Sequence, residues 1–278
     1  MKIFANSLAI IADLFYTKRF FLKTSPILFI RIVSLVTLSF SSTFAVDKSI
    51  PILCYHRFGQ EIKDSMTIKT KAFDEQVKWL MNNGYTVISL DTAAKYIKKE
   101  IQSIPDKSVV ITADDGHKSV YTDMAPIIEK YKIPVTLFIY PSAISNAKYA
   151  MTWDQLHELE ATKLFQVESH TYWHPNFKQE KKNLSKEEYE KSVHIQLYKS
   201  KATLEKKMGH DIKYLAWPFG LDDEYLLVKA KEAGYEMAFS VDKHNANQGF
   251  NNMAQPRHMI FNAYDLKRFE SISSGKEK

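Results

Sequence analysis

Cysteine is almost absent from this sequence, and the residues that mark fibrous or low-complexity chains are scarce as well. The 278 residues include one cysteine, Cys54, so no disulfide can form within the chain. The 8 glycines and 9 prolines exclude a collagen-like or low-complexity protein. No internal repeat is found, which argues against a solenoid. Cys54 stands in the apolar run PILCY, where a small core residue is expected rather than a nucleophile.

Outside the first 45 residues, neither basic nor acidic residues are in clear excess. The chain has 38 basic and 32 acidic residues, but residues 1–45 hold five of the basic residues and one of the acidic ones. The remainder has 33 basic against 31 acidic residues, which is typical of an ordinary solvated surface. We therefore expect no nucleic-acid partner, and one globular domain over residues 46–278.

The first 45 residues have the pattern of a targeting segment. An apolar stretch over residues 26–45 follows a basic region and ends on Thr43-Phe44-Ala45, which predicts a signal peptide cleaved after Ala45. The basic region is long and Arg31 interrupts the apolar run, so an uncleaved membrane anchor is the alternative. Both interpretations predict export, with the domain periplasmic, secreted or anchored facing outward. The second adds membrane association through this segment.

Strand-like and helix-like segments alternate over residues 50–261. Short apolar runs predict strands at 50–55, 85–90, 108–113, 134–140, 164–169, 214–219, 236–241 and 257–261. The segments between them predict helices, including a long one over about residues 185–208. Continuous apolar strands that alternate with helices indicate a parallel sheet covered by helices. About eight such strands predict an α/β barrel, whose functional groups gather at the C-terminal strand ends.

Two adjacent aspartates, Asp114 and Asp115, follow the apolar run at 108–113. Neighbouring carboxylates repel and raise each other's pKa, and a bound cation would offset that repulsion. A helix N-cap with first-turn acids is the plainer alternative, and LDDEY at 221–225 shows that pattern in the same chain. The buried strand before the pair and Gly116 after it favour a site.

Two histidines, His170 and His174, follow the predicted strand at 164–169. Pro175 disfavours a helix at His174, so we expect a turn that can still bring both imidazoles to one side. Two imidazoles and one carboxylate make a three-ligand site with an open position, as in catalytic zinc sites. The second carboxylate would then stand free beside the metal, where it could take a proton from water.

Three motifs in the chain resemble those of the polysaccharide deacetylases, the NodB-homology enzymes. TADDG (112–116), SHTYWHP (169–175) and AWPFG (216–220) have the order and spacing of that family's first three motifs. The likeness covers roughly residues 50–262. It implies a distorted (β/α) barrel of about seven or eight parallel strands. It also implies a divalent metal (Zn2+, with Co2+ or Ni2+ as alternatives) and hydrolysis of acetyl groups on sugars.

The resemblance assigns a role to each motif residue. Asp114 would be the general base, and the Phe219 N–H would help to hold the oxyanion. The implied metal ligands are Asp115, His170 and His174. Two departures from the family pattern stand out: Ala113 replaces the usual aromatic residue, and AWPFG lacks the arginine that orients the base.

The residue that protonates the leaving amine has two candidates. CYHRF (54–58) resembles a front-placed element of the poly-N-acetylglucosamine deacetylase branch, which makes His56 the first choice. His258, in QPRHMIF, stands where ordinary members place their late catalytic histidine. Four aromatic residues could stack on sugar rings, with core packing as the alternative for each. They are Trp153, Tyr172, Trp173 and Trp217.

Together these features predict a metal-dependent hydrolase that removes N-acetyl groups from an extracytoplasmic N-acetylglucosamine polysaccharide. Poly-β-1,6-N-acetylglucosamine, a biofilm polymer, is favoured because CYHRF resembles that branch. Deacetylation of peptidoglycan or xylan is the alternative reaction. The missing motif arginine favours a further alternative, a catalytically inactive glycan-binding protein on the same fold.

Overall fold

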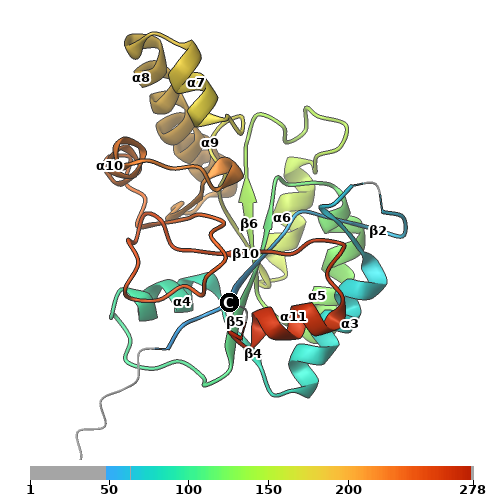
Figure 1. The fold of residues 1–278 in the computed structure, drawn as a ribbon. Coiled ribbons are helices and arrows are strands. Elements are labelled where there is room, and N and C mark those ends of the chain that lie inside the picture. The colour runs from blue at the N-terminus through green and yellow to red at the C-terminus, as the bar shows by residue number, and fades with distance from the viewer. Residues whose placement is uncertain (1–47, 63, 277–278) are drawn as a thin grey trace, which may run out of the picture. The chain divides into compact units, whose positions relative to one another are not determined.

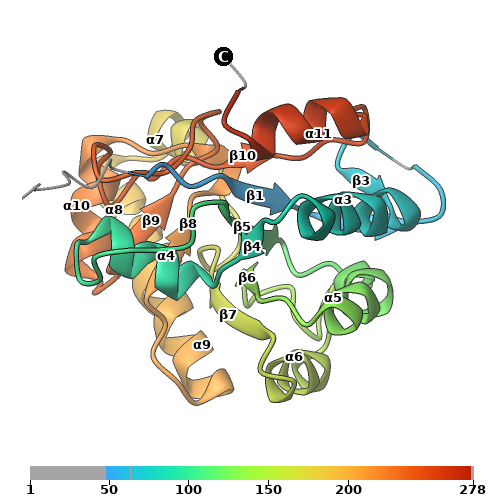
Figure 2. The same ribbon diagram turned by 90° about the horizontal axis from the view of Figure 1, so that it is seen from below.

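Seven parallel strands form the central sheet of this computed structural model, which describes residues 48–62 and 64–276 (Figure 1). In sheet order they are β10 (His258–Met259), β1 (Ile52–Tyr55), β5 (Ser108–Asp114), β6 (Val135–Ile139), β7 (Phe165–Ser169), β8 (Tyr214–Ala216) and β9 (Met237–Phe239). A short strand, β4 (Thr86–Val87), pairs with the start of β5. The sheet curls (Figure 2), which confirms the predicted distorted barrel.

An irregular segment spans the gap between β9 and β10. The Gln255 N–H donates to the Ala238 carbonyl of β9 at 2.9 Å, and the Ala238 N–H donates to the Asn252 carbonyl at 2.8 Å. The same segment continues into β10, where His258 lies opposite Leu53 of β1. Backbone hydrogen bonds on both sides of this segment therefore close the barrel. Because the segment is not a regular strand, the barrel is distorted at this position.

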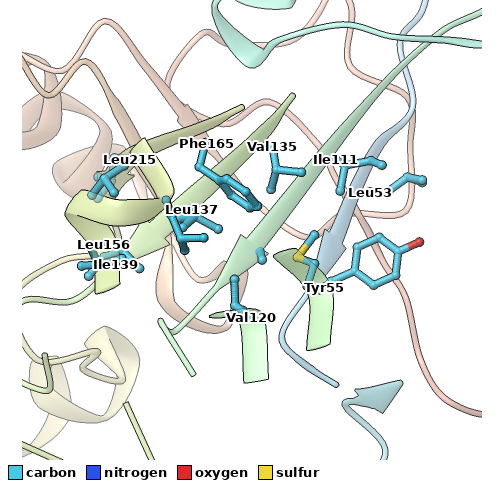
Figure 3. Close-up of a cluster of buried hydrophobic side chains, with 14 of the residues drawn as sticks. Leu53, Tyr55, Ile111, Val120, Val135, Leu137, Ile139, Leu156, Phe165 and Leu215 are labelled. Carbon is cyan, nitrogen blue, oxygen red and sulfur yellow. The ribbon is translucent and has the colours of Figure 1, made fainter. Parts of the chain in front are cut away.

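Side chains that alternate along the strands fill two apolar clusters. On β5, Ile111 belongs to the cluster beneath the outer helices (Figure 3), whereas Val110 belongs to an inner cluster with Phe138. Helix α4 (Leu90–Ile97) packs against the inner cluster. Because Asp114 shares the alternation of Val110, its side chain also points into the barrel.

In the described ranges, eight further α-helices surround the barrel, most of them packed on the outer cluster. They are α3 (Thr70–Asn82), α5 (Ala125–Tyr131), α6 (Trp153–Ala161), α7 (Phe177–Asn183), α8 (Lys186–His194), α9 (Ser200–Met208), α10 (Glu224–Glu232) and α11 (Leu266–Ser273). The sequence pattern predicts no element at α7 or α11. It also misses a small sheet of β2 (Arg57–Gly59) and β3 (Thr67–Lys69).

The long helix predicted over residues 185–208 is interrupted. A π-helical segment, η2 (Ile195–Lys199), joins α8 to α9. Ser185 caps α8 in a capping box with Glu188, as the sequence S-x-x-E suggests. Each π turn holds an extra residue, and such turns are frequent at functional sites.

Helix caps differ from the sequence prediction at one of two positions. The sequence predicts Asp91 as the N-cap of the helix that follows the strand at 85–90, because aspartate is a favoured cap. In the structure Ser89 caps α4 instead, by accepting the Thr92 N–H at 3.1 Å, so that prediction was wrong. Asp223 caps α10 by accepting the Leu226 N–H at 3.0 Å. The helix-cap interpretation of LDDEY is therefore confirmed.

The targeting segment predicted over residues 1–45 lies outside the residues that the structure describes. In the ranges 48–62 and 64–276, no helix combines the length and the apolarity that crossing a membrane would require.

Candidate active site

The C-terminal strand ends carry the chemically informative residues. Asp114 ends β5, and Asp115 follows it directly. His56 follows β1, His170 follows β7, and the turn at 217–220 follows β8. Because these strands are parallel neighbours, their ends lie on one side of the barrel.

The candidate metal-ligand group consists of Asp115, His170 and His174, whose side chains converge on one point. Their candidate ligand atoms all lie within 4.8 Å of one another. Oδ1 of Asp115 is 3.6 Å from Nε2 of each histidine. Ligands arranged tetrahedrally at about 2.1 Å from a zinc ion are about 3.4 Å apart, so this spacing fits a divalent metal. Oδ1 of Asp115 is also buried without a hydrogen-bond partner among the described residues, as expected of an acceptor that a cation would fill.

Hydrogen bonding and burial keep the imidazoles in the form that binds metals. Nδ1 of His170 lies 2.7 Å from the Ala216 carbonyl, which can only accept, so Nδ1 holds the proton and Nε2 presents its lone pair toward the point on which the three candidate ligands converge. Burial lowers the pKa of His170 to about 3 and also lowers the pKa of His174. Burial raises the pKa of Asp115, an effect that a bound cation would reverse.

Left-handed backbone conformations shape both motifs. Asp115 has φ of +74°, and Thr171 and His174 have φ of +65° and +61°. Such conformations cost about 1–3 kcal/mol each outside glycine and persist where the surrounding structure imposes them. Gly116 has φ of +73°, and a Cβ there would lie 3.0 Å from the Ile139 side chain. This explains the glycine in TADDG.

Asp114 is paired with a buried arginine, Arg257. Nη1 and Nη2 of Arg257 donate to the two carboxylate oxygens at 2.8 and 2.7 Å, and both side chains are almost fully buried. Burial alone would raise the pKa of Asp114, but Arg257 holds it well below the usual range. Nε of Arg257 donates to the Ser240 carbonyl at 3.1 Å, which fixes the guanidinium plane. Asp114 is therefore an ionised, oriented carboxylate beside the metal-ligand group.

Arg257 is the site residue that the sequence interpretation missed. The motif AWPFG lacks an arginine, and the structure places one against Asp114 from 143 residues away. The available signal was weak: Arg257 immediately precedes His258 in a short predicted strand, so the two must point to opposite faces. The sequence does not say which of the two side chains points into the barrel, because that depends on the pairing of this strand with β1.

His56 and Cys54 lie against Asp114 from β1. Cys54, His56 and Asp114 each offer one candidate ligand atom, and these three atoms lie within 4.8 Å of one another. Sγ of Cys54 donates a hydrogen bond to Oδ2 of Asp114 at 3.4 Å. Burial lowers the pKa of His56, opposed by the charge of Asp114. Burial raises the pKa of the Cys54 thiol, and the residue is fully buried, which agrees with its predicted core role.

Two other predicted residues lie apart from this group. His258 contacts Asn245, with Nε2 2.9 Å from Oδ1, and lines a separate cavity of about 280 Å³. Trp217 is fully buried, and its indole N–H donates to the Met253 carbonyl at 2.8 Å. Trp217 therefore packs in the core and has no exposed face on which a sugar could stack.

Two exposed aromatic rings lie at His174: one packs against its imidazole, and the other belongs to the residue before it. The Phe219 side chain is 57% exposed, and its ring centroid lies 4.6 Å from that of His174. Phe219 has φ of +58° in the turn after β8. Trp173 is 41% exposed, whereas Tyr172 is half-buried with Nζ of Lys199 4.2 Å above its ring.

A cavity opens beside the metal-ligand group. It has a volume of about 320 Å³ and is lined by Asp115, Arg57, His117, Tyr140 and Tyr149. A second cavity, of about 340 Å³, shares Arg57 and His117 with the first. Each volume is within the range of small-molecule sites.

Comparison with known proteins finds a match to one family model and several relatives. Residues 102–238 match the family model described as polysaccharide deacetylase. A Staphylococcus aureus (strain MRSA252) protein named poly-beta-1,6-N-acetyl-D-glucosamine N-deacetylase is 29% identical over 206 residues, which are 73% of this chain and 70% of that protein. A protein of the same name from Escherichia coli (strain K12) is 26% identical over 263 residues, covering 81% of this chain and 39% of that protein.

Solved structures share the fold. IcaB from Ammonifex degensii matches with a TM-score of 0.70 at 22% identity, covering 84% of this chain and 98% of that one. The Streptococcus pyogenes deacetylase PplD, in complex with acetate, matches with a TM-score of 0.73 at 20% identity, covering 84% of this chain and 100% of that one.

Proposed function

We propose that this chain, whose residues 102–238 match the polysaccharide deacetylase family model, hydrolyses the N-acetyl groups of an exported N-acetylglucosamine polymer, with poly-β-1,6-N-acetylglucosamine as the favoured substrate. The observation that carries this proposal is the convergence of Asp115, His170 and His174 beside an ionised Asp114. The substrate assignment is supported by the names of the S. aureus and E. coli relatives.

We assign the metal to Asp115, His170 and His174, with zinc as the favoured ion. A bound Zn2+ would supply Lewis acidity, which activates water and polarises the acetyl carbonyl. The three residues leave one side of the site open toward the cavity that Asp115 lines, where an acetyl group would enter.

Asp114 is the proposed general base. Arg257 keeps the carboxylate ionised and fixes its plane, so it can accept a proton from the attacking water. The pairing also weakens the inactive-protein alternative, since that alternative was motivated by the arginine missing from AWPFG.

His56 is the proposed general acid for the leaving amine. It lies in the same group of side chains as Asp114, whereas His258 contacts Asn245 beside a different cavity. The Phe219 N–H is the proposed donor to the developing oxyanion, because the turn after β8 lies next to His174. The exposed rings of Phe219 and Trp173 would contact the sugar chain.

Acetate release from defined substrates tests this function. Purified protein would be assayed with β-1,6 and β-1,4 oligomers of N-acetylglucosamine and with acetylated xylan. We expect release from the β-1,6 oligomers to be fastest. Faster release from β-1,4 oligomers would move the substrate assignment to chitin or peptidoglycan. Faster release from xylan would show that the preferred bond is an acetyl ester and not an amide.

The cellular location is part of the proposal. We propose that residues 1–45 direct export and that the enzyme acts outside the cytoplasm, where the polymer is found. Free amines would make the polymer cationic, which suits adhesion to anionic surfaces in a biofilm. Mass spectrometry of the protein recovered from cells would show whether cleavage follows Ala45 or the segment remains as an anchor.

A further inference from the structure

The turn that connects His170 to His174 is held in an unfavourable backbone conformation. Thr171 and His174 both have positive φ, at +65° and +61°. Between them, Tyr172 and Trp173 lie beyond the end of β7 at Ser169, so their N–H groups are not part of a strand ladder. A turn of this kind keeps its shape only where neighbouring groups impose it.

Gln196 supplies the contact that holds this turn. Its side chain is fully buried, and Oε1 accepts the N–H of Tyr172 at 2.9 Å and the N–H of Trp173 at 3.0 Å. One amide oxygen therefore uses both lone pairs on consecutive backbone groups. Nε2 of Gln196 is buried without a hydrogen-bond partner among the described residues. A buried donor without a partner is unfavourable, so the residue is better explained by its acceptor than by its packing.

The π-helical segment η2 brings Gln196 to the turn. Within the same segment, the Leu197 carbonyl accepts the Tyr235 hydroxyl at 3.1 Å. One turn further on, Oγ of Ser200 donates to the Thr171 carbonyl at 2.8 Å. The helix thus contacts the turn at both an N–H pair and a carbonyl, and the π turn sets the spacing between these contacts.

We propose that Gln196 is a positioning residue for metal binding: its amide oxygen fixes the turn that aims His174 at Asp115. This inference rests on the metal site proposed above. Gln196 touches neither the ligand atoms nor the cavity, so it would act through the backbone of Tyr172 and Trp173. Partners of this kind typically change metal affinity by about 10–100-fold.

Zinc binding to the full chain tests the proposal. Gln196→Met keeps the length and removes the acceptor, while Gln196→Glu keeps an acceptor oxygen. Gln76→Met is the matched control, because Gln76 is also buried and accepts a hydrogen bond, from the Tyr55 hydroxyl at 2.8 Å. Affinity for Zn2+ would be measured by competition with a chromophoric chelator, and thermal unfolding would be followed on the metal-free proteins.

We expect Gln196→Met to lose about 10–100-fold in zinc affinity, and Gln196→Glu to lose less than tenfold. Gln76→Met should bind zinc like the unmodified protein while losing as much metal-free thermal stability as Gln196→Met. Unchanged zinc affinity in Gln196→Met would overturn the proposal, as would equal losses in the Met and Glu variants or a loss in the Gln76 control.

Two further variants separate a failure of the Gln196 proposal from a failure of the proposed metal site. If Gln196→Met does not fold, Gln196→Asn replaces it, because the shorter amide cannot reach both N–H groups; zinc affinity equal to that of Gln196→Glu would then overturn the proposal. His174→Ala tests the metal site itself. If that variant binds zinc like the unmodified protein, the ligand assignment fails, whatever Gln196 does.

Discussion

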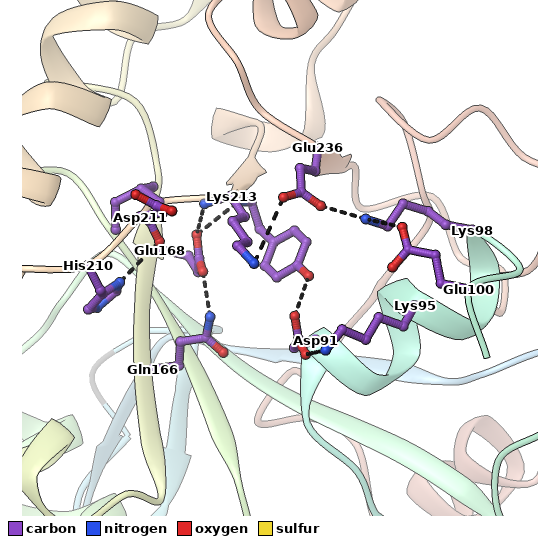
Figure 4. Close-up of polar contacts among 12 residues, drawn as sticks. Asp91, Lys95, Lys98, Glu100, Gln166, Glu168, His210, Asp211, Lys213 and Glu236 are labelled. Carbon is purple, nitrogen blue, oxygen red and sulfur yellow. Dashed lines mark hydrogen bonds and ion pairs between the residues drawn. The ribbon is translucent and has the colours of Figure 1, made fainter.

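Two groups of buried polar side chains in this barrel differ in whether their acceptors are satisfied. At the C-terminal strand ends, Oδ1 of Asp115 is buried and has no partner among the described residues. Around the N-terminal ends of β8 and β9, Glu168 is also fully buried, but both its oxygens accept hydrogen bonds (Figure 4). The donors are Gln166 Nε2 at 2.7 Å and the N–H groups of Lys213 and Tyr214 at 2.9 and 2.8 Å.

The contrast shows that a perturbed pKa does not by itself mark a functional site. Burial raises the pKa of Glu168 to about 8, against three donated hydrogen bonds that lower it. A search for perturbed carboxyl groups alone would therefore select Glu168. The missing partner at Asp115 is the more informative observation, because buried polar groups in folded proteins are nearly always paired.

The sharpest test of this contrast compares the two adjacent aspartates. Asp115→Asn should lose both bound zinc and measurable turnover, because a ligand is removed. Asp114→Asn should keep zinc and lose about 10²–10⁴ in rate, because the proton acceptor is removed while the ligands remain. Metal analysis and acetate release on the same samples decide the outcome. Equal loss of zinc in both variants would show that both aspartates are ligands.

A pair of histidines extends the comparison to proton transfer. Nδ1 of His56 is buried without a partner among the described residues, whereas Nε2 of His210 lies 2.8 Å from the Glu160 carboxylate. His56→Ala should lower the rate by about 10²–10⁴, as expected for a general acid, and His210→Ala should leave it unchanged. Steady-state rates at saturating substrate check both. If His258→Ala shows the larger loss instead, the acid assignment moves to that residue.

The paired charge at the active site should matter more for stability than a paired charge at the surface. Arg257→Met leaves Asp114 buried and uncompensated, which should cost about 3–5 kcal/mol of unfolding free energy. Arg57→Met breaks an ion pair with Asp64 that is about one-third exposed, and should cost about 0–1 kcal/mol. Urea unfolding of the metal-free proteins measures both. Similar losses would contradict the assignment of Arg257 as the buried partner of Asp114.

The expected effect that is most spread out over conditions is a change in the pH dependence of stability. The folded-state pKa of Glu168 is raised above that of the unfolded chain, so its contribution to stability is complete below about pH 4.5 and is lost as the pH rises through about 8. The slope in this window is at most about 1.4 kcal/mol per pH unit for one group. Glu168→Gln should flatten it in unfolding curves recorded from pH 5 to 8. An unchanged slope would show that another group titrates.

The barrel and the metal-ligand group could be predicted because their signals are local. Parallel strands buried on both faces are continuous apolar runs, and Asp115, His170 and His174 follow two such runs directly. Knowing that strand ends meet on one side was enough to bring these residues together.

Arg257 and Gln196 could not be predicted because their partners are set by tertiary structure. The strand after Arg257 has two residues, and its place beside β1 leaves no trace in the sequence pattern. Val193, Leu197 and Leu204 keep a helical spacing of four and seven residues across η2, so the periodicity does not reveal the π turn that aims Gln196. The wrong cap at Asp91 arose similarly, since Ser89 and Asp91 are both good caps by residue type.

The segment that closes the barrel also carries Arg257, and this ties the maturation of the site to the end of the chain. β1 is paired on one side with β5 and on the other with β10, so the first strand of the barrel is flanked by its last. Contacts over such long sequence separations require both segments to be present and are opposed by the entropy of closing the loop between them. During synthesis, Asp114 therefore remains without its guanidinium partner until residues 252–259 have emerged and docked. A nascent chain therefore carries the candidate metal ligands before the residue that orients the Asp114 carboxylate has been synthesised.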